Sequence, residues 1–69
     1  MSKKDLKKFG QRLKFLRRQQ NMTQFQLSEI LDMSPNFIGM IERGERNTTV
    51  ENVFKLARAL NVTPAEMFQ

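Results

Sequence analysis

The sequence predicts one small all-α domain. The chain has 69 residues, enough for a single small core. It carries only two Pro and three Gly, fewer than a turn-rich all-β chain needs, and no segment alternates apolar and polar residues for long enough to form a strand. Apolar residues recur instead at steps of three and four, the spacing of one helical face. We therefore expect residues 1–69 to form one helical domain.

Two helices are predicted in the first half of the chain. The first covers residues 2–20, with its inward face formed by Leu6, Phe9, Leu13 and Leu16. Gln20 and Asn21 end it. Thr23 then serves as an N-cap, because its hydroxyl can accept from an otherwise unpaired backbone N–H, and opens a shorter helix over residues 24–31. The predicted buried residues of this helix are Leu27, Ile30 and Leu31.

A third helix is predicted over residues 35–43, after a tight turn at Asp32 and Met33. Ser34 caps it, and Pro35 suits the first helical position, where no backbone donor is needed. Gly44 ends it in the left-handed conformation. The inward residues of this helix are Ile38 and Ile41.

Two more helices complete the chain. After a polar loop over residues 45–48, Thr49 opens a helix over residues 50–60, which Asn61 ends. Its helical face is formed by Val50, Val53, Leu56, Ala57 and Leu60. A capping box between Thr63 and Glu66, with Pro64 at the first position, predicts a one-turn fifth helix over residues 64–68.

The composition excludes several kinds of function. Without Cys or His, the chain lacks disulfides, the usual zinc ligands and the commonest general base. No paired carboxylates share a predicted site and no glycine-rich loop could hold a nucleotide, so we expect no enzyme, cofactor, metal or small-molecule substrate. No apolar run approaches the about 20 residues of a membrane span, and the N-terminus lacks the apolar stretch of a signal peptide. We expect an intracellular module without a membrane partner.

The positive charge is concentrated at the start of the chain. The net charge is +5, yet residues 1–18 alone hold eight Lys or Arg and one Asp. Such a charge suits an anionic partner. For residues 3–8, a solvated lysine-rich face remains an equal alternative. A membrane-surface helix is disfavoured, because the core needs the apolar face of this helix.

The two short helices between Thr23 and Gly44 are the most informative feature. Periodicity alone predicts only a helical pair. In a DNA-binding helix-turn-helix the second helix of such a pair lies in the major groove, so its outer face must be free. That outer face would carry Ser34, Asn36, Phe37 and Met40, flanked by Arg43 and Arg46.

Five stretches then carry a family resemblance. They are Phe-Gly-Gln-Arg-Leu (9–13), Leu-Arg-Arg (16–18), Met-Thr-Gln-Phe-Gln-Leu (22–27), Ile-Glu-Arg-Gly-Glu-Arg-Asn (41–47) and Leu-Ala-Arg-Ala-Leu-Asn-Val-Thr-Pro (56–64). From Phe9 to Phe68 the chain resembles the Cro/phage-repressor (XRE-like) helix-turn-helix domain. Arg-Asn-x-Thr at 46–49 is also similar to controller proteins of restriction–modification systems. The resemblance implies a five-helix lambda-repressor-like fold and a cytoplasmic, nucleoid-associated transcriptional regulator that binds a double-stranded DNA operator as a homodimer.

The resemblance also implies residue roles for DNA binding. Gln24 would face a phosphate and brace the reading helix. The exposed positions of that helix are matched by Ser34, Pro35, Asn36, Phe37 and Met40. Asn36 could pair with adenine through two hydrogen bonds. Phe37 could pack on a thymine methyl or be partly buried, and Met40 could contact the groove or the edge of the core.

Further roles concern the following loop, one ion pair and a dimer. Arg43, Arg46 and Asn47 would contact backbone phosphate, with Arg46 also within reach of a base; the alternative is solvated arginines balanced by Glu42 and Glu45. Arg17 and Glu42 would form a structural ion pair. Surplus apolar residues predict a dimer interface, or else the edge of the core, at Phe54, Met67 and Phe68.

Three departures from the family pattern keep a second function open. Asp32 stands where many relatives carry glycine, Pro35 replaces a polar reader, and Gly39 interrupts the third helix. With fewer polar readers, the domain could depend more on DNA shape. The alternative is a helical protein-interaction module, antitoxin-like or adaptor, with weak or no base readout.

Overall fold

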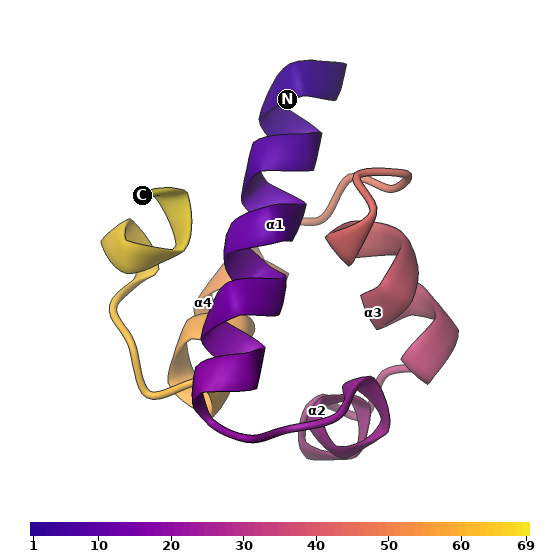
Figure 1. The fold of residues 1–69 in the computed structure, drawn as a ribbon, viewed down its shortest axis with the longest axis vertical. Helices are drawn as coiled ribbons and strands as arrows, with labels where there is room; N and C mark the ends of the chain where they lie inside the picture. Colours follow the sequence, from indigo (N-terminus) through magenta and orange to yellow (C-terminus); the bar gives the residue numbers. More distant parts are fainter.

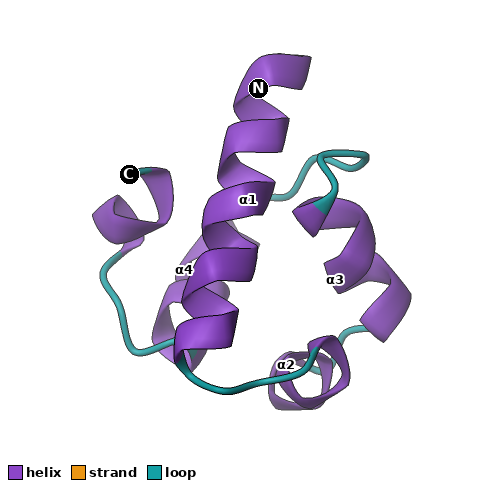
Figure 2. Ribbon diagram, viewed as in Figure 1, coloured by secondary structure: helices purple, strands orange, loops and turns teal.

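The computed structural model describes all 69 residues as four α-helices and one final 3₁₀ helix, with no strand (Figures 1 and 2). The elements are α1 (Lys3–Gln19), α2 (Gln24–Leu31), α3 (Pro35–Glu42), α4 (Val50–Ala59) and η1 (Pro64–Phe68). The all-helical prediction is confirmed, and each predicted helix boundary is met within one residue. No helix combines the length and apolarity that crossing a membrane requires.

The predicted fifth helix is present over residues 64–68, but it is a 3₁₀ helix, so the fold has four α-helices and the prediction of five is wrong. The Thr63–Glu66 capping box is present, and the backbone N–H of Glu66 donates to the carbonyl of Thr63 at 3.0 Å, an i to i+3 bond. A segment this short gains little from α-helical bonds, so the tighter 3₁₀ turn is the usual outcome.

α1 is the central element of the molecule (Figure 1). It packs against α3 on one side and against η1 on the other. α4 also contacts η1, and α2 packs against both α3 and α4. At the crossing of α1 and α3, a Cβ on Gly10 would overlap the carbonyl oxygens of Ile41 and Glu42. The two helix backbones therefore touch at Gly10, which fixes how α3 sits on α1.

Local capping explains where each helix begins and ends. Every helix starts at a Ser or Thr whose hydroxyl accepts the backbone N–H three residues later: Ser2, Thr23, Ser34, Thr49 and Thr63. Four connections turn through left-handed residues: Asn21, Asp32, Asn61 and Gly44. Asp32 takes this conformation at φ 54°, which Asp tolerates better than most other non-glycine residues.

All four helices and η1 contribute side chains to the core, and so does the connecting residue Leu60, which follows α4. Its buried apolar members are Phe9, Leu13, Leu16, Leu27, Ile38, Ile41, Val53, Leu56, Ala57, Leu60 and Met67. Four residues predicted on inward faces lie outside this buried set: Ile30 is 58% exposed, Val50 is 73% exposed, and Leu6 and Leu31 are half-buried. On α2 the buried residues are Leu27 and Ser28, and Ile30 lies on the exposed side. Val50 is the first residue of α4, one turn before its buried face begins.

Candidate nucleic-acid interface

The outer surface of α3 and of the loop after it is largely exposed to solvent. We call it the α3 face; its exposed members are Ser34, Pro35, Asn36, Arg43, Arg46 and Asn47. Ser34 holds the start of α3, because its hydroxyl accepts the backbone N–H of Phe37 at 3.0 Å, and Pro35 occupies the first helical position. This surface therefore presents polar and cationic side chains from a fixed helix end.

Two apolar residues of the α3 face are half-buried. Phe37 packs against the core, as the alternative prediction of partial burial required. Met40 is also half-buried. The guanidinium carbon of Arg46 lies 5.8 Å from the centroid of the Phe37 ring. A cation over an aromatic face is attracted by the ring's electrons, so Phe37 serves as a platform that orients Arg46.

A buried polar network supports α3 from behind. Arg17 donates from Nε to Oε2 of Glu42 at 2.7 Å and from Nη2 to Oε1 at 3.0 Å, and both side chains are almost fully buried. Arg17 Nη1 also donates to the carbonyl of Met22 at 2.6 Å. The predicted partners thus form a two-bond ion pair between α1 and the end of α3, and Arg17 also binds the turn before α2.

Gln24 joins this network from the first position of α2. Its Nε2 donates to Oε1 of Glu42 at 3.0 Å. The side chain is therefore used for bracing α3, one of the two roles implied for it, and it remains partly accessible.

The presence of glycine at position 39, inside a helix, has a structural explanation that could not be predicted from the sequence. A Cβ on Gly39 would lie 3.0 Å from Nη1 of Arg43 and 3.4 Å from Oε1 of Gln24. The missing side chain makes room for both polar groups on the flank of α3. The sequence offered only the helix-breaking cost of glycine, because both neighbours reach it through space.

The two arginines of the α3 face differ in their partners. Arg43 pairs with Glu45, Nε to Oε2 at 3.0 Å, and this hydrogen bond raises the pKa of Arg43 above its ordinary value. The predicted alternative of an arginine balanced by Glu45 thus describes Arg43 in the isolated chain. Arg46 has no carboxylate within ion-pair distance. The Oδ1 of Asn47 accepts the backbone N–H of Thr48 at 2.8 Å, which leaves its amide nitrogen free to donate.

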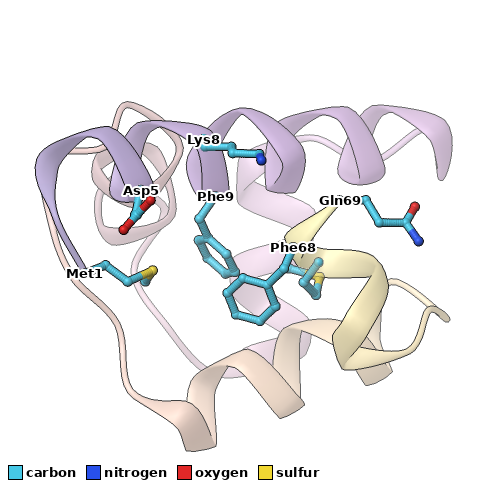
Figure 3. A pocket seen from close by; sticks show the side chains of 7 residues that line it. Met1, Asp5, Lys8, Phe9, Phe68 and Gln69 are labelled. Atoms are coloured by element: carbon cyan, nitrogen blue, oxygen red, sulfur yellow. The ribbon is translucent and has the colours of Figure 1, made fainter.

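The predicted dimer residues fall into two groups. Phe54 is 46% exposed and Phe68 is 53% exposed. The prediction of Met67 as an interface residue is wrong, because Met67 is fully buried: η1 turns it into the core, where α1 and α4 both pack. Phe68, one residue later, is half-exposed, and its ring centroid lies 5.2 Å from that of the core residue Phe9 (Figure 3).

The exposed aromatic rings border an apolar groove between α4 and η1. The groove has a volume of about 250 Å³ and is lined by Val50, Val53, Phe54, Pro64, Ala65 and Phe68. Val50 was predicted for the core, and nothing in the helical spacing distinguishes it from Val53. A second hollow of about 270 Å³ lies on the α1 side of Phe68, beside Asp5, Lys8 and Phe9 (Figure 3).

Known proteins match this chain over most of its length. The helix-turn-helix family model matches residues 13–67. Control protein C.BamHI of Bacillus amyloliquefaciens is 37% identical over 60 residues, covering 86% of this chain and 74% of that protein. The crystal structure of the restriction-modification controller protein C.AhdI from Aeromonas hydrophila is similar at a TM-score of 0.91 and 42% identity, covering 94% of this chain and 98% of that one. The DNA-binding domain of BldD is similar at a TM-score of 0.90 and 28% identity, over 100% of both chains.

Proposed function

This chain belongs to the helix-turn-helix family of XRE-like regulators, and from that premise we propose that it binds a specific, near-palindromic DNA operator as a homodimer, with α3 in the major groove. The single observation that carries the proposal is the α3 face itself. It is exposed and mostly polar, yet it is held in place by the Arg17–Glu42 pair and Gln24. A reading helix needs both properties, because base contacts require free side chains at fixed positions.

Each member of the α3 face has a proposed role. Asn36, exposed in the first turn of α3, would pair with adenine through two hydrogen bonds. Arg46, oriented by the ring of Phe37, would reach a guanine or a phosphate. Met40 and the open edge of Phe37 would contact a thymine methyl.

The remaining members would position the protein on the backbone. Arg43 and Asn47 donate towards phosphates from the loop after α3, and Gln24 adds the free part of its amide at the start of α2. Ser34 and Pro35 fix the helix end close to the duplex, where neither supplies a strong base contact.

We further propose that two copies pair through the apolar groove between α4 and η1, with Val50, Phe54 and Phe68 at its centre. Their exposure and the groove's apolar lining support this. A two-fold dimer would place its α3 helices about one DNA turn apart, roughly 34 Å, on two half-sites. The names of C.BamHI and C.AhdI support a role as the controller protein of a restriction–modification system.

In-vitro selection from random duplex DNA tests the proposal. We expect the wild-type chain to enrich a near-palindromic site. On that site, Asn36→Ala should relax the preference at one base pair, Arg46→Ala should weaken binding, and Arg58→Ala, an exposed arginine on α4, should bind like wild type. Failure to enrich any duplex at low salt would contradict the proposal and favour the alternative of a protein-interaction module.

A further inference from the structure

An open hollow of about 720 Å³ lies between the first turns of α1 and the loop that follows α3. Figure 1 shows that loop beside the N-terminal half of α1. The residues that line the hollow are Lys3, Lys4, Leu6, Lys7, Arg43, Gly44 and Glu45. Arg43 belongs both to this hollow and to the α3 face, so the two surfaces are continuous.

The hollow carries an excess of positive charge. Four cations border it, while its single carboxylate, Glu45, is already paired with Arg43 at 3.0 Å. The three lysines are exposed, and none of them takes part in an ion pair. The rest of the chain therefore leaves these charges available to an external anion.

The helix backbone that carries the lysines is also held in a fixed position relative to α3. A Cβ on Gly44 would lie 2.9 Å from the Cα of Lys7 and 3.0 Å from its backbone nitrogen, so the loop touches the backbone of α1 there. One turn further along, Gly10 makes the backbone contact with α3 described above. These two contacts place the basic end of α1 at a set distance from the α3 face, which lowers the ordering cost of binding.

We propose that Lys3, Lys4 and Lys7 bind backbone phosphates of the duplex read by α3, flanking the base pairs that the α3 face contacts. This inference rests on the proposed function. It follows because a duplex continues on both sides of the base pairs that are read, and its phosphates are the anions that a cationic surface continuous with the α3 face would meet. The lysine-rich start of the chain then acts in binding, in addition to solubility.

The test compares two triple variants of equal charge. K3Q/K4Q/K7Q removes the lysines of the hollow, whereas K8Q/K14Q/R18Q removes three exposed cations from other parts of α1; each lowers the net charge of +5 by three. The affinity for a mixed-sequence duplex several turns long is measured against salt concentration, after thermal unfolding has shown that both variants fold. Each lost phosphate contact should reduce the slope of log K against log salt by about 0.9, so the hollow variant should lose about 2 to 3 and the matched variant less than about 1.

Equal slopes for the two triple variants would overturn the inference, since long-range charge alone would then explain the effect. If the slopes are equal while Arg46→Ala still weakens binding to the selected duplex, the hollow is not a phosphate site and the proposed function stands. If no variant of the α3 face alters binding either, the proposed function itself fails. Ethylation of individual phosphates gives a second readout: interference at flanking phosphates should be lost only in K3Q/K4Q/K7Q.

Discussion

Arg17 and Glu42 are the two charged side chains that the fold buries. Removing one of them leaves the other charge buried and unpaired, so Arg17→Ala should lower the free energy of unfolding by about 3 to 5 kcal/mol. Urea unfolding followed by circular dichroism measures this. The matched control is Glu45→Ala, which breaks the exposed pair with Arg43 and should change stability little. Equal stability of Arg17→Ala and wild type would contradict the structural role of the pair.

Two glycines should respond to alanine in opposite ways. Gly10→Ala forces a methyl group against backbone carbonyls of α3, which cannot move aside cheaply, so we expect a loss of about 1 to 3 kcal/mol. Gly39→Ala meets only the ends of two flexible side chains and gains up to about 1 kcal/mol of helix propensity. Melting temperatures of the two variants give the comparison. An unfolded Gly39→Ala beside an unaffected Gly10→Ala would show that the described packing of α3 is incorrect.

The role of a residue could be predicted when its partner lies close in the sequence, but not when its partner is distant in the sequence and near only in the folded structure. The capping hydroxyls of Thr23 and Ser34 could be identified because each bonds three residues ahead. The contact of Arg46 with Phe37, and the space that Gly39 leaves, depend on how α3 and its neighbours fold against one another. The pairing of Arg17 with Glu42 was foreseen only through family resemblance.

At the scale of elements, the first turn of η1 is stabilised by hydrogen bonds that depend on pH. The backbone N–H and the hydroxyl of Thr63 both donate to Oε1 of Glu66. These bonds, the backbone one most of all, lower the pKa of Glu66 below its ordinary 4.5. A carboxylate with a depressed pKa stabilises the fold above its unfolded pKa and loses that contribution as pH falls through the folded value. Arg12 ties the same segment to α1 by donating to the carbonyl of Glu66 at 2.8 Å.

Glu66→Gln should therefore be less stable than wild type at neutral pH, and the difference should shrink as pH falls below about 4.5. Gln keeps the size of the side chain and one acceptor but cannot carry the charge. Thermal unfolding of both proteins between neutral pH and pH about 3 gives the difference directly. A difference that stays constant across this range would rule out ionised Glu66 as the source.

Element boundaries followed from capping chemistry, but the type of the last element and the exposure of Ile30 and Val50 did not. Periodicity assigned Ile30 and Val50 to the core because both lie at helical spacing from buried neighbours. Which side of α2 meets α3 and α4, and where the core stops along α4, is decided by tertiary packing. The length of η1, five residues, decided against α-helix.

At the scale of the whole molecule, the proposed dimer predicts a concentration-dependent mass. Replacing Phe54 and Phe68 together by Ala should shift sedimentation equilibrium towards monomer, because both rings border the groove between α4 and η1. Phe15→Ala provides the control, since Phe15 is 48% exposed on α1, away from that groove. A wild-type chain that stays monomeric at every accessible concentration would contradict the dimer.

The overall charge was visible in the sequence, but its arrangement was not. Composition placed most of the positive charge in residues 1–18, which suggested an anionic partner without giving its location. The start of α1 is brought next to the α3 face by tertiary contacts, that of Lys7 with Gly44 and that of Gly10 with the end of α3. Arg12, counted with the same charge, is used instead within the fold, to hold η1.

The central claim is that the α3 face contacts DNA. Titrating isotope-labelled protein with the selected duplex and following its backbone amide resonances tests this claim most directly. The account predicts that the first and largest shifts occur at residues 34–40 and 43–47, with residues near Arg58 on α4 unchanged. Shifts confined to the exposed surfaces of α2 or α4, with residues 34–40 unaffected, would contradict it.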